Sequence, residues 1–598
     1  MQKLLKYIIL FGIFTLPLIN SRITELLWFS FSIPVNWNFE FTKVMFFNVW
    51  SGVVIGLYLV QSLLTKESRS ALPTAVIFFY LILVFSTHLS TSPYISFFWN
   101  EIKSHSFIMW SNLVWLFIVF QLILNKAFFK QIIITFIVSW IFVSIIWFKE
   151  YFFPTFNYWD LWNRLFSTFG HPNYVSIFLV SLIPFLYNPL SNFPPKGERI
   201  AQLSIILLFL AALLFTKSVF AIFLFVCFNL WYFNNISPFF KGSTLKWNAR
   251  GRASFIKYSV ALLTIAWSSF LLFNFFPEKL HSFISRYFIW ETSFKTIFSD
   301  IKIFLIWWWT ETLVFYFDNF KSQYLYIFEN LGFSADRPHN IILNFFYHFW
   351  VWWLAIILWI YFKVFSYKNT EWIHKFTPTR VSLILMLLFL LLNPTSIVLY
   401  LFIVILLANV LVFPLVKNKD QGKRYYWSNI ILFTVITIIS IYWAYYSIKY
   451  YYSENKTYNK QLLQAKNIYK YNPNSYFYSW DFVKWLEISR IPTTEYYYTK
   501  IKYTEEINEK IKICNNYITK YNYAETYFFC GNELWYLEKN KAKQYYKQWL
   551  DLLPDLWNKN SKYYSKFLVK YLNINWNRFL SKKYWLAQIL ERVWIINE

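Results

Sequence analysis

The stretch SIVLYLFIVILLANVLVF, residues 396–413, contains no charged side chain and is long enough to cross the apolar core of a bilayer as a helix. Similar apolar segments follow one another along the first three quarters of the chain, which predicts an all-α, polytopic membrane bundle of about 13 transmembrane helices. The predicted spans begin near Leu4, Val44, Leu72, Phe107, Gln131, Tyr174, Ile200, Lys217, Tyr258, Ile341, Ser382, Ser396 and Ser428.

The composition supports a membrane protein. The chain has 598 residues, of which 57% are hydrophobic, and this content excludes an ordinary soluble protein. The net charge of +27 is typical of nucleic-acid binding, but many of the basic residues fall in short loops between apolar segments, where they set orientation instead. We therefore expect no nucleic-acid partner. The three cysteines show no metal-ligand spacing, so we expect no metal site. We also expect no cofactor. A disulfide between Cys514 and Cys530 stays open as an alternative.

The distribution of positive charge predicts the orientation of the spans. With the N-terminus inside, every inner loop carries lysine or arginine, as in Lys66 with Arg69 and Lys126 with Lys130. The same count places residues 277–340 and the C-terminal part outside a bacterial cytoplasmic membrane. This orientation depends on tight turns near Thr216 and Asn393, because the loss of one helix there would invert everything that follows.

The composition changes near residue 447, after which no run is long enough to span a bilayer. We predict a transmembrane domain at 1–447 and an external helical domain at 448–598. Within the latter, Ala542, Tyr546, Trp549 and Pro554 fall at the offsets of the second helix of a tetratricopeptide repeat. Gly531 and Leu534 sit near the first-helix positions, one residue out of register. The alternative is an ordinary helical hairpin; a true repeat requires further degenerate copies beside it.

The interval from Phe276 to Asn340 is the one long polar stretch among the apolar segments. It holds two compact charged signatures, Ser285–Trp290 and Asp336–Asn340, the second of which runs into the predicted span at Ile341. Arginines and a histidine at the boundary of a membrane helix suit an anionic, lipid-borne substrate. The alternative is that both arginines are interfacial anchors whose side chains reach the headgroups.

Four stretches, in order, resemble the O-antigen ligase and polymerase superfamily of bacterial membrane glycosyltransferases. They are Arg164 to Asn173, Thr216 to Ser218, Ser285 to Trp290 and Asp336 to Asn340. The resemblance covers roughly residues 95 to 365. None of the four motifs is specific to the family by itself, and the resemblance depends on their occurring together in this order. It implies transfer of a glycan from an undecaprenyl-diphosphate carrier to an acceptor on the outer face of the membrane, without a metal or a nucleotide sugar.

The resemblance also implies roles for the charged residues. Arg286 and Arg337 suit the diphosphate, because guanidinium groups form paired, charge-assisted hydrogen bonds that strengthen as charge develops on the leaving group. His339 suits the general base that an acceptor hydroxyl requires. The remaining candidates are auxiliary, substrate-binding positions: Arg164, Lys217, His171, Asn173 and Asn340.

The auxiliary positions carry structural interpretations as well. After the position of Thr216 the family usually has the pair Ser-Arg. If Lys217 replaces that arginine, its ammonium group offers a point charge in place of the planar guanidinium group. His171 and Asn173 are expected chiefly to form a turn around Pro172, with Asn173 capping the next helix, and Asn340 is expected to cap the helix after His339.

Tryptophan and glycine usage is inverted in this chain. It has 10 glycines and 32 tryptophans, whereas glycine ordinarily makes up about 7% of residues. Where the family shows glycine after its arginine and histidine motifs, this chain has tryptophan. We interpret these positions as glycines encoded by UGA and read as tryptophan; the alternative is a chain that is simply rich in aromatic residues. The positions after the two motifs are Trp307, Trp309, Trp350 and Trp353; Trp99 and Trp549 are further candidates elsewhere in the chain.

The resulting prediction is a metal-independent membrane glycosyltransferase, with a lipid, glycan or protein as acceptor. A glycan polymerase and a protein O-oligosaccharyltransferase of the same superfamily remain open. Two other classes also remain: a transporter or flippase for the lipid-linked glycan, which would require ionisable residues deep within spans, and a non-catalytic envelope scaffold.

Overall fold

The computed structural model describes residues 1–19, 39–65, 106–152, 167–169, 171–187, 196–235, 277–298, 378–391, 396–410, 504–520, 524–534 and 536–551, with pieces of one to three residues elsewhere. These residues are helical and contain no strand, which confirms the all-α prediction for this part of the chain. They belong to two compact units. Unit 1 comprises residues 1–277, 304–312 and 339–490; unit 2 comprises residues 278–303, 313–338 and 491–598.

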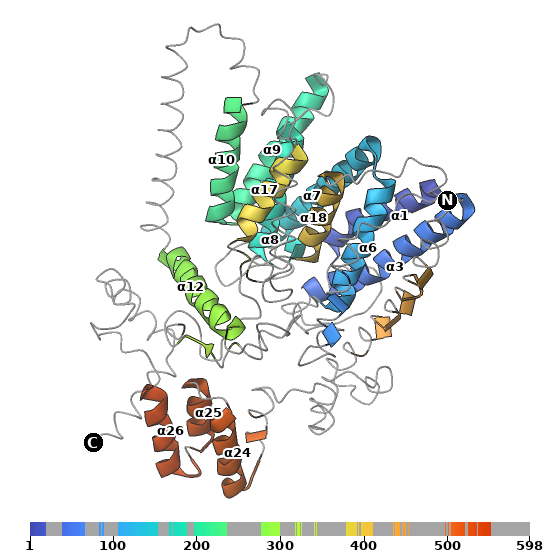
Figure 1. Cartoon of the computed structure of the whole chain (residues 1–598). Helices are drawn as coiled ribbons and strands as arrows, with labels where there is room; N and C mark the ends of the chain where they lie inside the picture. Colours follow the sequence, from blue (N-terminus) through green and yellow to red (C-terminus); the bar gives the residue numbers. More distant parts are fainter. Residues whose placement is uncertain are drawn as a thin grey trace. The chain divides into compact units, whose positions relative to one another are not determined.

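The described helices of unit 1 begin close to nine of the predicted starts (Figure 1). The other predicted starts, near Leu72, Tyr258, Ile341 and Ser428, lie outside the described residues. The helices are α1 (Gln2–Leu18), α3 (Phe39–Thr65), α6 (Phe107–Ile123), α7 (Lys126–Phe152), α8 (Pro172–Tyr187) after the 3-10 turn η1 (Ser167–Phe169), α9 (Lys196–Phe215), α10 (Val219–Asn235), α17 (Pro378–Leu390) and α18 (Ile397–Val410).

Two of these helices are long and apolar enough to cross a membrane. They are Thr42–Leu64 of α3 and Lys126–Ile146 of α7, with mean hydropathies of 1.7 and 2.1. Shorter apolar helices include α6, α17 and α18. The described part of the chain is therefore compatible with membrane association, and the total of about 13 spans stays a prediction.

Helix α6 is enclosed by its neighbours on nearly every side, and only Phe117 and Gln121 of its residues are not buried. A helix that is apolar all round is stable only when it is surrounded. Polar side chains fix its position within the bundle. The Asn112 amide donates to the Asn48 side-chain oxygen of α3 at 3.0 Å, and the Gln121 amide donates to the Ala408 carbonyl of α18 at 2.7 Å.

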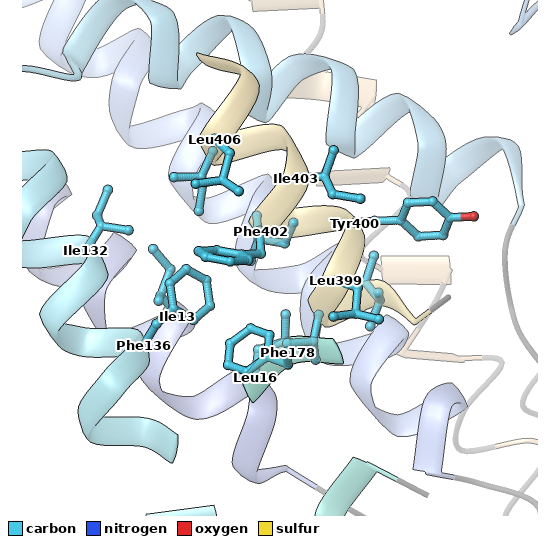
Figure 2. Packing of buried hydrophobic residues seen from close by; sticks show 14 of the residues in the cluster. Ile13, Leu16, Ile132, Phe136, Phe178, Leu399, Tyr400, Phe402, Ile403 and Leu406 are labelled. Atoms are coloured by element: carbon cyan, nitrogen blue, oxygen red, sulfur yellow. The ribbon is translucent and has the colours of Figure 1, made fainter. Parts of the chain in front are cut away.

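Aromatic rings from three helices meet at the centre of the bundle. Phe402 of α18 packs against Phe136 of α7 and Phe178 of α8, with ring centroids 4.8 and 5.4 Å apart (Figure 2). Phe136 and Phe178 contact each other edge to face at 5.5 Å. This edge-to-face packing aligns the electron-poor edge of one ring with the face of the next, so it restricts how α18 docks against α7 and α8.

Helices α1 and α3 pack through one small and one large residue. The indole N–H of Trp50 donates to the Ile8 carbonyl at 2.9 Å, and the indole ring lies against Gly12. A side chain at Gly12 would overlap that ring, so glycine is required here for close approach of the two helices.

The outward face of α7 is apolar. Ile134, Val138, Phe142 and Ile145 are exposed and spaced at three or four residues, so they form one row along the helix. Leu4, Tyr7 and Phe11 form a similar exposed row on α1. In water such rows would be unfavourable, whereas contact with lipid tails removes that cost.

Unit 2 contains α12 (Pro277–Ile297), α24 (Ile507–Lys520), α25 (Ala524–Leu534) and α26 (Lys539–Asp551). The first 21 residues of the polar interval at 277–340 form α12, and the external position of this interval stays a prediction. This helix buries one face through Ser285, Phe288, Ile289, Thr292 and Thr296, a helical period that its low overall hydropathy concealed.

Helices α25 and α26 form an antiparallel hairpin. Gly531 lies against the ring of Tyr546, where an added Cβ would be 2.9 Å from the nearest ring carbon. The Tyr546 hydroxyl donates to the Asn532 side-chain oxygen at 2.6 Å. A helical pair is thus present where the sequence predicted one, and its assignment to a tetratricopeptide repeat stays a prediction.

Candidate functional site

Polar side chains gather where α3, α8 and α18 begin and α1 ends. The centre of this polar cluster is Lys43, which is fully buried. Its ammonium group donates to the carbonyls of Ile19, at 2.8 Å, and Thr168, and it lies 5.7 Å from the centre of the Phe169 ring. Lys43 therefore binds the segment after α1 to the 3-10 turn that precedes α8.

Glu40 precedes Lys43 by almost one helical turn in α3 and is also buried. One of its carboxylate oxygens accepts a hydrogen bond from the backbone N–H of Ile397, the first residue of α18. A carboxylate at a helix N-terminus satisfies an N–H that lacks an intrahelical partner and interacts favourably with the helix dipole. Glu40 thereby ties α3 to the start of α18.

Thr168 extends the same cluster to the end of α1. Its hydroxyl donates to the Pro17 carbonyl at 2.7 Å. The last carbonyls of a helix have no intrahelical donor, and here Thr168 and Lys43 supply donors to the carbonyls at and just beyond the end of α1. The η1 turn is thus connected to both α1 and α3.

His171 caps α8. Its Nδ1 atom accepts a hydrogen bond from the backbone N–H of Asn173 at 3.1 Å, and Pro172 occupies the first helical position. An accepting Nδ1 carries no proton, so the neutral imidazole holds its proton on Nε2 and acts there as a donor. The predicted turn around Pro172 is present, and the capping residue is His171 in place of Asn173.

Asn173 connects this turn to a distant part of the chain. Its side-chain amide donates to the side-chain oxygen of Asn393 at 2.8 Å, and the Asn393 amide donates to the Phe389 carbonyl at 3.1 Å. Both asparagines are buried. Asn393 lies between α17 and α18, so the start of α8 and the α17–α18 turn are held together by amide hydrogen bonds.

Lys217 lies at a second turn, between α9 and α10. The Thr216 hydroxyl donates to the Leu213 carbonyl at 2.7 Å, which closes the end of α9. Lys217 is exposed and has a φ of 50°, a left-handed conformation that is uncommon for residues other than glycine, asparagine and aspartate. The turns predicted near Thr216 and Asn393 are both confirmed, because a helix ends before each and another begins after it.

Arg286 lies in α12 of unit 2 and is half-buried, between buried Ser285 and exposed Tyr287. The buried face of α12 is fixed in part by Thr292, whose hydroxyl oxygen accepts a hydrogen bond from the Ser322 backbone N–H at 3.0 Å. Arg286 is therefore carried by a helix with a defined buried face. Within unit 1, the Asn340 side-chain oxygen accepts from the Leu343 N–H at 3.1 Å, which confirms its predicted capping role.

Three predicted residues, Arg164, Arg337 and His339, lie outside the described residues. Of the others, Asn173 is joined to Asn393, while Lys43 holds Thr168 in the turn that precedes His171. Among the residues that it describes, no group of three or more histidine, cysteine, aspartate or glutamate side chains is placed to hold a metal ion.

Sequence reasoning missed Glu40 and Lys43. The available signal was a pair of opposite charges three residues apart at the start of an apolar span, where ionisable residues are costly and usually have a specific partner. Comparisons with protein-family models, with curated proteins and with solved structures found no match to this chain.

Proposed function

We propose that the protein is a membrane glycosyltransferase of the O-antigen ligase type, which moves a glycan from an undecaprenyl-diphosphate carrier to an acceptor hydroxyl. The observation that carries the proposal is the set of buried polar contacts that joins η1, the start of α8 and the start of α18. An apolar bundle that buries a lysine, a glutamate and two asparagines to join these segments is expected to use them to position a substrate or a reactive group.

In this proposal Arg286 and Arg337 bind the diphosphate, His339 removes the acceptor proton, and Arg164 and Lys217 add cationic contacts. The neutral His171 donates from Nε2 to a glycan or phosphate oxygen. The leaving group is a diphosphate, so the reaction draws its driving force from the carrier lipid and requires no metal or nucleotide sugar.

The proposed location is the bacterial cytoplasmic membrane, with the N-terminus inside and the C-terminal helical domain outside. The exposed apolar rows of α1 and α7 support contact with lipid. The position of the buried charges also favours a transferase over a transporter. Glu40 and Lys43 lie at the beginning of the apolar part of α3, whereas a transport pathway places ionisable groups near the middle of spans.

The test is glycan transfer by full-length protein in proteoliposomes. The donor is membrane lipid from a strain that accumulates an undecaprenyl-diphosphate-linked glycan, and the acceptors are lipid A–core and unglycosylated envelope protein, offered separately. Transfer is measured as a shift of the acceptor on a gel. We expect transfer by the wild type and a loss of about 100-fold or more for His339→Ala and Arg286→Ala.

Matched controls come from the same chain. His88→Ala removes an exposed histidine, and Lys295→Ala removes a cation of α12 that is paired with Glu291 at 2.9 Å. Both should retain transfer. Wild-type transfer that survives His339→Ala and Arg286→Ala would refute the assigned roles. Movement of the lipid-linked glycan across the bilayer without transfer would identify a flippase.

A further inference from the structure

Unit 2 contains two cysteines that the proposed reaction does not use. Cys514 lies in α24 and Cys530 in α25, and both side chains are fully buried. Cys514 is close enough to act on the protonation of the Cys530 thiol. They belong to one apolar cluster with Ile513, Tyr517 and Leu534.

The cysteines lie in register on two antiparallel helices. Lys510, one turn before Cys514, pairs with Glu533, just after Cys530, with 3.8 Å between Nζ and Oε2. The α26 helix covers this contact, because the Tyr545 hydroxyl donates to the Asn515 side-chain oxygen at 2.7 Å. The packing of three helices thus holds the two cysteines in one apolar cluster, at the contact between α24 and α25 where a disulfide would have to form.

We propose that Cys514 and Cys530 form a disulfide in the native protein. Two S–H bonds break and one S–S bond forms; the two electrons and two protons reduce the disulfide of a thiol–disulfide oxidoreductase or a small-molecule disulfide to two thiols. The bond closes a loop over residues 515–529 and fixes α24 to α25. The required oxidant is present outside the cytoplasmic membrane, so the inference rests on the proposed orientation.

The bond forms before unit 2 closes. Burial raises the pKa of the Cys530 thiol, and the neighbouring Cys514 acts in the same direction. The thiolate is the species that attacks a disulfide, so the closed, reduced domain reacts slowly. Oxidation therefore accompanies folding, and the closed domain then protects the bond from reductants.

The experiment counts thiols in the full chain. Membranes are quenched with acid, denatured, alkylated without reductant and digested, and the peptides are identified by mass spectrometry. We expect a linked peptide pair containing Cys514 and Cys530, lighter by two hydrogens than the sum of the free peptides. Cys227 of α10 is an internal control and should be alkylated. Cys514→Ser and Cys530→Ser should each release the partner cysteine for alkylation.

The membrane orientation is measured in a separate experiment, so that a failure of the disulfide proposal can be distinguished from a failure of the proposed orientation. Tyr536, which is 84% exposed, is replaced in a chain whose three cysteines are alanine, as Tyr536→Cys. A membrane-impermeant maleimide applied to intact cells then reports the side on which unit 2 lies. Labelling from outside together with free thiols at 514 and 530 would overturn the disulfide alone. Free thiols without outside labelling would overturn both the disulfide and the proposed orientation.

Discussion

The side-chain amide of Asn173 donates to the side-chain oxygen of Asn393 at 2.8 Å, across 220 positions of the chain. This bond joins the turn that His171 caps to the turn between α17 and α18. Two predicted turns that are far apart in the sequence of unit 1 therefore share one buried hydrogen bond, and the position of His171 depends on residues far from it in sequence.

Loss of that bond should destabilise the membrane domain. Asn393→Ala and Asn173→Ala are each expected to cost about 1–3 kcal/mol, and the double variant less than their sum, because each single change removes the same buried hydrogen bond. Thermal unfolding in detergent measures the effect. Asn409→Ala is the control: its amide donates to Thr379 at 3.1 Å from a partly exposed position, so a smaller cost is expected. Fully additive costs would show that the two asparagines act independently.

Removal of the buried ammonium group should be more damaging. Lys43→Met leaves the Glu40 carboxylate buried without the neighbouring positive charge, and it removes the donor to Ile19 and Thr168, so we expect a loss of about 3–5 kcal/mol. Glu40→Gln combined with Lys43→Met should recover part of the loss. Size-exclusion chromatography of detergent extracts gives the folded fraction. A wild-type elution profile and unchanged melting temperature for Lys43→Met would contradict the assigned role.

The contact between Gly12 and Trp50 predicts that a glycine-to-alanine substitution destabilises the protein at Gly12 of α1 but not at Gly56 of α3. Gly12→Ala places a methyl group in the indole ring and should destabilise the bundle by about 1–3 kcal/mol. Gly56→Ala in α3 is the matched control, because its new Cβ would meet the Thr437 methyl at an ordinary 3.4 Å. That change should be neutral or slightly stabilising. Equal effects of both substitutions on the melting temperature would reject the packing argument.

The stability of unit 2 should decline at a lower alkaline pH when Cys514 and Cys530 are reduced than when they form a disulfide. Burial raises the pKa of Cys530 and of Tyr545, so the folded state keeps these protons after the unfolded state has released them. Stability is therefore complete below the unfolded pKa and declines above it. We expect the decline above about pH 8.5 for the dithiol and only above about pH 10 for the disulfide.

Limited proteolysis of unit 2, with and without reductant, follows this decline. Tyr545→Phe should reduce the loss above about pH 10, at the cost of the hydrogen bond to Asn515. An identical pH profile for both redox forms would argue against the contribution of the thiol.

The codons of the tryptophans test the recoding hypothesis. Trp307, Trp309, Trp350 and Trp353, which lie outside the described residues, should be encoded by UGA. Trp50 should be encoded by UGG, because its indole N–H donates to the Ile8 carbonyl and its ring fills the space beside Gly12. UGG at all five positions would make the aromatic composition genuine and weaken the resemblance at two of its motifs.

Local patterns were sufficient to predict much of unit 1. Apolar runs located the helices, and short polar breaks located the turns at Thr216 and Asn393, because both signals act over one or two helical turns. The contacts of Lys43 and Glu40 were not predictable in this way. Their partners Thr168 and Ile397 lie 125 and 357 positions further along the chain, and no local pattern specifies such pairs.

The remaining differences have equally specific causes. The cap of α8 is a histidine. The Nδ1 atom of His171 accepts the Asn173 backbone N–H, a role that short polar side chains usually fill at this position. The polar character of 277–297 concealed a helix, because a half-buried helix needs only one apolar face, and α12 has one.

The enclosure of α6 has a consequence for the order of assembly. Asn112 meets Asn48 of α3, which is synthesised earlier, whereas Gln121 meets Ala408 of α18, which emerges 287 positions later. During translation α3 and α6 can therefore pair before the Gln121 amide has its partner, and an amide without a partner among apolar side chains is costly. A chain that ends before α18 therefore lacks the Ala408 carbonyl that the Gln121 amide binds, and only completion of α18 supplies it.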